Sequence, residues 1–161
     1  MIFINKDVTM SAIRLTEENL KSIISESVRR ILAEERSDET DNKIKELISF
    51  LHNAQKPVRE IHWNTSEYAL HMVTDETIDD LCEWEDGLAE AYMADRDIEL
   101  KISDKKPSSD TEFKTIINEL IDLASDVKES VSGNKEYDNV CAVLDEILET
   151  GSQLLYKSEL K

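Results

Sequence analysis

Glycine and proline are scarce in this sequence, which has 3 glycines and 2 prolines among its 161 residues. Folds built on β-sheets need many turns, and these two residues most often supply them. The shortage argues against all-β and doubly wound folds and favours long helices joined by short connections. Hydrophobic residues make up 40% of the chain, which is enough for one domain with one core.

Long apolar runs and cysteine motifs are also missing. The longest apolar runs span only a few residues, which excludes a membrane-spanning helix, and the first ten residues lack the apolar core of a signal peptide. We therefore expect a cytoplasmic location. Cys82 and Cys141 stand alone, without the spacing of a metal motif or a disulfide framework, and we expect both to be small core residues.

Basic residues are few: 19 Lys and Arg face 36 Asp and Glu, and the net charge is −17. A chain this acidic repels nucleic acid and anionic membranes, and it attracts cations, including metal ions. No long basic tail offsets that charge. We therefore expect neither a nucleic-acid partner nor a membrane partner.

The N-terminal part of the chain predicts an amphipathic helix over residues 16–35. Thr16 is suited to cap its N-terminus, and apolar residues recur at three- and four-residue spacing. Residues 36–41 are all polar and break this pattern, so we predict a linker there. The expected organisation is a leader, helix and linker in residues 1–38, followed by the main domain in residues 39–161. The apolar stripe of the helix consists of Leu20, Ile23, Ile24, Val28, Ile31 and Leu32.

Four further helical patterns predict a four-helix bundle. They cover about residues 41–64, 66–100, 110–132 and 135–157, and each carries apolar residues at helical spacing. The polar loop 101–109 and the Gly133-Asn134 pair separate the last three. The predicted fold class is therefore all-α: a four-helix bundle with an additional N-terminal amphipathic helix.

The helix predicted for residues 66–100 has two distinct faces. Apolar residues between Leu70 and Tyr92 occupy one arc, and a second arc of about 100° holds one imidazole, one thiol and four carboxylates. No Lys or Arg lies between His71 and Glu90 to neutralise them. We call this second arc the acidic stripe; it consists of His71, Asp75, Asp79, Cys82, Asp86 and Glu90.

The acidic stripe indicates that a cation or a basic partner covers it, because carboxylates four residues apart destabilise a bare helix by a few tenths of a kcal/mol. Imidazole combined with carboxylates suits iron, zinc or manganese. The alternative is a solvated acidic surface that serves solubility. His62 adds a further ligand candidate because it lies on the inward face of the preceding helix, near the turn.

Helix geometry separates the stripe into two pairs. His71 with Asp75 and Asp86 with Glu90 lie about 22 Å apart along one helix, so they cannot reach one metal. An antiparallel second copy would bring the first pair of one chain against the second pair of its mate, giving two equivalent sites at the interface of a homodimer or larger homo-oligomer. A di-iron site inside one bundle is excluded, because the chain has no Glu-x-x-His motif.

The run His62-Trp63-Asn64, His71-x3-Asp75 and Asp86-x3-Glu90 resembles the ferroxidase signature of the Dps mini-ferritins, which belong to the ferritin-like superfamily. The resemblance implies iron as the bound metal. It assigns His62, His71 and Asp75 of one subunit, with Asp86 and Glu90 of its mate, as metal ligands and catalytic residues for Fe(II) oxidation by peroxide or O2. That activity would sequester iron and protect against oxidants.

A second set of features includes His-Trp-x-Thr-x-x-Tyr-x-x-His over residues 62–71, the later Asp-x3-Glu, and an ending with Asp145-Glu146-Ile147 and Leu155-Tyr156-Lys157. In these features the chain resembles small ferritin-like proteins of tailed phages. This resemblance implies a location in the cytoplasm of a bacterial host or inside a virion. Two features differ from Dps. The spacing between the two histidines is three residues shorter, and the loop after the second bundle helix is too short for the helix that Dps packs at its dimer interface. A twelve-subunit shell is therefore not implied.

Two other functions are compatible with this sequence. In the first, the bundle is a non-catalytic phage scaffold or interaction module, and the helix over residues 16–35 docks into a groove of a protein partner. That helix would equally well pack on its own bundle or pair with a copy of itself. In the second, zinc or manganese replaces iron and has a structural role.

Overall fold

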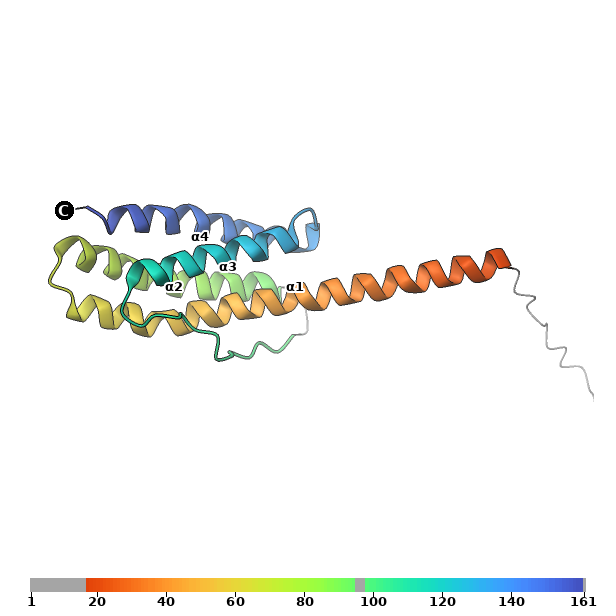
Figure 1. Cartoon of the computed structure of the whole chain (residues 1–161), viewed down its shortest axis with the longest axis horizontal. Coiled ribbons are helices and arrows are strands. Elements are labelled where there is room, and N and C mark those ends of the chain that lie inside the picture. The colour runs from red at the N-terminus through yellow and green to blue at the C-terminus, as the bar shows by residue number, and fades with distance from the viewer. Residues whose placement is uncertain (1–16, 95–97, 161) are drawn as a thin grey trace, which may run out of the picture. The chain divides into compact units, whose positions relative to one another are not determined.

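The computed structural model describes residues 17–94 and 98–160, and the described chain is helical without a β-strand. The elements are α1 (Glu17–Asn64), α2 (Tyr68–Met93), α3 (Phe113–Val131), the short 3-10 helix η1 (Lys135–Tyr137) and α4 (Asp138–Lys157), shown in Figure 1. The predicted all-α class is confirmed. The predicted leader and the Thr16 cap lie outside the described residues.

Two of the connections between helices are short. Residues 65–67 join α1 to α2, and the backbone N–H of Glu67 donates to Thr65 Oγ1 at 3.1 Å. Between α3 and α4, Gly133 adopts a φ of 78°, a left-handed conformation that a side chain would disfavour. The Asn134 side chain then accepts a hydrogen bond from the Glu136 N–H. Each connection reverses the chain, so the helices that it joins are antiparallel (Figure 1).

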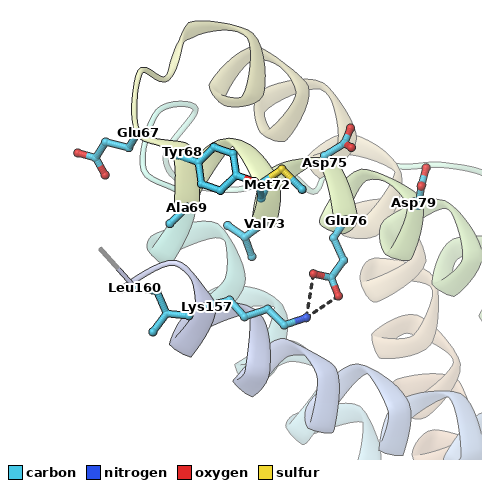
Figure 2. A pocket seen from close by; sticks show the side chains of 10 residues that line it. All are labelled: Glu67, Tyr68, Ala69, Met72, Val73, Asp75, Glu76, Asp79, Lys157 and Leu160. Atoms are coloured by element: carbon cyan, nitrogen blue, oxygen red, sulfur yellow. Dashed lines mark hydrogen bonds and ion pairs between the residues drawn. The ribbon is translucent and has the colours of Figure 1, made fainter.

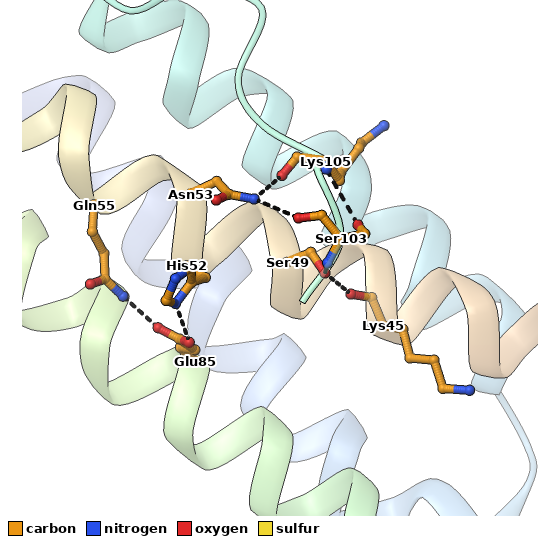
Figure 3. Close-up of polar contacts among 8 residues, drawn as sticks. All are labelled: Lys45, Ser49, His52, Asn53, Gln55, Glu85, Ser103 and Lys105. Carbon is orange, nitrogen blue, oxygen red and sulfur yellow. Dashed lines mark hydrogen bonds and ion pairs between the residues drawn. The ribbon is translucent and has the colours of Figure 1, made fainter. Parts of the chain in front are cut away.

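The connection between α2 and α3 is long and returns along the bundle. Its residues 98–112 form no helix and pass over α1, where Asn53 Nδ2 donates to the backbone oxygens of Ser103 and Lys105 at 3.0 and 2.7 Å (Figure 3). The N–H of Ser103 also donates to Ser49 Oγ at 3.0 Å. Because of this crossover, α2 and α3 run in the same direction (Figure 1).

The prediction that the second bundle helix extends to residue 100 is wrong. Helix α2 ends at Met93, and Ala94 has an extended ψ of 128°. Ile98 and Leu100 lie outside any helix and pack partly buried against the core. Helical spacing alone did not reveal that these two apolar residues pack against the core from a segment that is not helical. Residues 95–97, also part of that prediction, lie outside the described residues.

The core lies between the four helices and uses the apolar faces expected from the sequence. In α3 the apolar residues at helical spacing are all buried: Phe113, Ile116, Ile117, Leu120, Ala124, Val127 and Val131. On the apolar arc of α2, Leu70 and Ile78 are partly buried, and the others are buried: Val73, Leu81, Trp84, Leu88 and Tyr92. Three buried hydroxyl groups satisfy their hydrogen bonds within their own helices by donating to the carbonyl four residues earlier; they belong to Ser49, Thr74 and Thr77.

The chain divides into two compact units, with the boundary between Ser37 and Asp38. This boundary lies inside the linker predicted for residues 36–41, but the expected break in the helix is wrong, because α1 is helical throughout this segment. None of these residues is Gly or Pro, and Thr40 is 8% exposed. The Tyr137 hydroxyl donates to the Asp41 carboxylate at 2.9 Å, so tertiary contacts stabilise the second half of this polar segment. In the first unit, the six stripe residues from Leu20 to Leu32 are 47–54% exposed.

Candidate metal site

His62 and His71 lie side by side where α1 ends and α2 begins. Their rings stack with centroids 4.1 Å apart and an angle of 21° between the planes. The Nδ1 atom of each ring faces the backbone oxygen of the other residue, at 3.1 Å for His62 and 3.2 Å for His71. The tight connection over residues 65–67 produces this reciprocal arrangement by bringing the two ends together.

The reciprocal hydrogen bonds determine where each neutral ring carries its proton. A carbonyl oxygen only accepts, so each Nδ1 must be the donor, and the proton of each neutral imidazole resides there. Both Nε2 atoms then keep a lone pair. Histidine ligands of metals are commonly oriented in this way, with the other ring nitrogen donating to a carbonyl or carboxylate.

Asp75 lies next to the pair formed by His62 and His71, on the exposed side of His62. Its Oδ1 lies 3.9 Å from His62 Nε2, and its side chain is 69% exposed, whereas that of His62 is 15% exposed. The buried Thr74 hydroxyl lies 3.3 Å from His62 Nδ1 and donates to the backbone oxygens of Leu70 and His71. Sequence reasoning missed Thr74, since its helical position placed it among the core residues. It holds the start of α2 against the His62 ring.

Asp86 and Glu90 do not join this group within one chain. They lie on the same helix about 16 Å or more further along, counted from Asp75 at 1.5 Å per residue. All six members of the acidic stripe are exposed, so the stripe is open to another molecule along its whole length. Among the described residues, no group of three or more His, Cys, Asp or Glu side chains is arranged to hold a metal ion.

The two cysteines lack the features of reactive thiolates. Cys82 is exposed on the stripe and Cys141 is half-buried, so the core position expected for Cys82 is wrong. Burial of the sulfur is the main cause that raises the pKa of each thiol above its ordinary value. For Cys82 the neighbouring carboxylates of Glu85 and Asp79 add to this effect, while Arg59 opposes it. The neutral thiol is therefore favoured at both positions.

A second acidic group lies between α2 and α4. Burial, followed by the charges of Glu76 and Glu83, raises the pKa of Asp80 to about 6. One of its carboxylate oxygens is buried and has no hydrogen-bond partner among the described residues. Sequence reasoning missed this environment, because Asp80 is one acidic residue among many on α2.

The third histidine is not part of the site. His52 Nδ1 lies 2.8 Å from the Glu85 carboxylate, which also accepts a hydrogen bond of 2.5 Å from Gln55 Nε2 (Figure 3). These contacts join α1 to α2. Glu85 lies beside the core face of α2 and is partly buried.

No helix in residues 17–94 and 98–160 is long and apolar enough to cross a membrane. Comparison with known proteins gives one match to a family model, the "Family of unknown function (DUF5856)", over residues 62–158. No curated protein and no solved structure matches the chain. The family match begins at His62, includes every candidate ligand and covers more than half of the chain. The chain therefore belongs to the DUF5856 family, whose function is unknown.

Proposed function

We propose that this protein is a ferritin-like, Dps-like iron-binding protein that oxidises Fe(II) at sites shared between two copies of the chain. His62, His71 and Asp75 come from one copy, and Asp86 and Glu90 come from the other. The reciprocal hydrogen bonds between His62 and His71 carry the proposal, because they leave both Nε2 lone pairs for a metal. The long crossover between the second and third helices is also typical of ferritin-like bundles.

The second copy supplies the ligands that one chain lacks. Two antiparallel α2 helices related by a two-fold axis bring the His71 end of each chain to the Glu90 end of the other. The exposure of the whole acidic stripe supports this pairing. On its own such a pairing would repel, since each stripe carries four carboxylates, and bound cations would relieve that repulsion.

Iron is the substrate in this proposal. Two Fe(II) ions each give one electron to hydrogen peroxide, which takes up two protons and leaves as two water molecules. With O2 as the oxidant, the same two electrons and two protons yield hydrogen peroxide. The carboxylates of Asp75, Asp86 and Glu90 favour the harder Fe(III) product, whereas the imidazoles bind Fe(II). Taking both electrons at one site avoids release of hydroxyl radical.

Anaerobic titration with Fe(II), followed by addition of peroxide, tests the proposal. The wild-type chain should bind about one to two Fe(II) ions per chain in a saturable manner and oxidise them faster than buffer does. His62→Ala and His71→Ala should weaken binding at least about tenfold, because each removes a ligand. His52→Ala is the matched control and should bind as wild type, since His52 contacts Glu85 instead. Absence of saturable binding to the wild-type chain would rule out the proposal.

A further inference from the structure

A groove lies on the outer surface between the start of α2 and the end of α4. Its volume is about 790 Å³, and part of its lining is apolar: Tyr68, Met72, Val73 and Leu160 (Figure 2). Tyr68 is 80% exposed, and Met72 and Leu160 are 49% and 50% exposed. We call this feature the α2–α4 groove. Large apolar side chains exposed together in a hollow are typical of a surface that binds a partner.

Carboxylates line the same groove. Glu67, Asp75, Glu76 and Asp79 all contribute to it, and Lys157 is the only base among the described lining residues. Lys157 Nζ is bound to both carboxylate oxygens of Glu76, at 2.6 and 2.8 Å (Figure 2). Three carboxylates therefore surround an apolar surface without a lysine or arginine of the groove paired to them. A partner with apolar and basic side chains would complement this lining.

The helical segment over residues 20–32 has that chemistry. Its six apolar side chains are each about half exposed and cover an arc of about 180° on the helix surface. On the same helical wheel, Lys21 and Arg30 lie at opposite edges of the arc. Residues 19–32 contain three basic residues, Lys21, Arg29 and Arg30, and one acidic residue, Glu26. Residues 19–32 therefore form an amphipathic helical segment with a net positive charge, in contrast to the strongly acidic residues 38–161.

The distribution of charge favours docking between these two parts. Residues 1–37 contain 6 basic and 6 acidic side chains, so the other 13 basic and 30 acidic side chains give residues 38–161 the whole net charge of −17. Two copies of the segment over residues 19–32 would repel each other when paired, because each has an excess of positive charge. The acidic groove attracts the same segment.

We propose that the apolar face of residues 20–32 in one copy docks into the α2–α4 groove of a second copy. This is helix-in-groove recognition, in which apolar residues at three- and four-residue spacing fill the groove and the flanking bases meet its carboxylates. The contact joins two different surfaces, so the assembly either closes as a reciprocal dimer or extends further. It requires no metal and goes beyond the proposed iron chemistry.

Sedimentation velocity in the presence of EDTA tests the docking without any contribution from metal. The helix variant is Ile24→Asp combined with Ile31→Asp, and the groove variant is Met72→Arg; the three side chains are exposed, so folding should be retained and circular dichroism can verify it. We expect the wild-type chain to associate with increasing concentration. Each variant should weaken this association at least about tenfold, since a charge replaces an apolar contact.

Matched controls separate docking from general effects of charge. Ser22→Asp adds an exposed acid on the side of the same helix opposite the apolar arc, and Ile102→Arg replaces another exposed apolar residue, 43% exposed, away from the groove. Both controls should associate as wild type. Mixing the helix variant with the groove variant should restore a one-to-one complex, because the mixture contains one intact helix and one intact groove.

Three results would overturn the proposal. A wild-type chain that stays monomeric in EDTA would place the helix on its own bundle or on another protein. Association that survives Met72→Arg but not the helix variant would show that the helices pair with each other. Association that neither variant weakens would show a different interface. None of these results bears on iron binding by His62 and His71, which is measured separately.

Discussion

The imidazole Nδ1 of His52 lies 2.8 Å from a carboxylate oxygen of Glu85 and joins α1 to α2 in the middle of the bundle. The Glu85 side chain is 23% exposed, and its other carboxylate oxygen accepts a hydrogen bond from Gln55 Nε2. One carboxylate thus organises two side chains of the neighbouring helix. His52 therefore contacts Glu85 and not the two stacked histidines, His62 and His71, at the end of the bundle.

Replacing Glu85 should destabilise the fold. Glu85→Ala removes both hydrogen bonds to α1, and we expect the free energy of unfolding to fall by about 1–2 kcal/mol. Urea denaturation followed by circular dichroism measures this change. Glu83→Ala, which removes an exposed acid from the same helix, should change the free energy by less than about 0.5 kcal/mol. Equal effects of the two substitutions would contradict a structural role of the Glu85 contacts.

The two helical glycines should respond differently to alanine. A Cβ at Gly87 would lie 3.8 Å from Val143 Cγ2, an ordinary contact, so Gly87→Ala should raise the free energy of unfolding by about 0.5–1 kcal/mol through helix propensity. A Cβ at Gly151 would lie 3.0 Å from Ile121 Cγ1. Crowding there should offset the gain, so Gly151→Ala should be the less stable of the two in thermal and urea unfolding.

The environment of Asp80 should make stability depend on pH. Its pKa is raised from 3.8 to about 6 by burial and by neighbouring carboxylates. Between these two values the folded state binds more protons than the unfolded state, so this group lowers stability as the pH rises from about 4 to about 6. At neutral pH, Asp80→Asn should be more stable than wild type by about 1 kcal/mol, after allowance for solvent screening.

Unfolding curves of wild type and Asp80→Asn at several pH values measure this effect. The difference between the two proteins should disappear below about pH 4, where the carboxyl is protonated in both states. Asp79→Asn, at an exposed position next to it, serves as the control. A constant difference across the pH range would show that titration of Asp80 is not its cause.

Mixed assemblies test whether the proposed iron site is shared between copies. His71→Ala alone and Asp86→Asn with Glu90→Gln alone should each lose iron oxidation, because every site contains a defect. In a dimer of one of each, one site carries both defects and the other is intact. A random equal mixture should therefore recover about a quarter of wild-type activity. No recovery after verified subunit exchange would contradict a site that is shared between two copies.

The sequence determined the helices and their buried faces. The apolar spacing that predicted the core of α3, from Phe113 to Val131, reflects the period of a single helix, so it needs no knowledge of distant residues. The same arithmetic separated the acidic stripe of α2 from its core face, and all six members of the stripe are exposed. It also predicted that Asp75 and Asp86 cannot meet in one chain.

Only the tertiary structure decided which side chains meet. In the polar segment at residues 36–41, distant parts of the bundle stabilise the second half: Thr40 is buried, and Asp41 accepts a hydrogen bond from the Tyr137 hydroxyl. His62 and His71 stack because residues 65–67 turn the chain, and nothing in their spacing of nine residues predicts that geometry. Helical periodicity is a local property that can be read from neighbouring residues. Contacts between helices depend on the whole packed bundle, where burial and hydrogen bonding choose among arrangements that a local pattern allows equally.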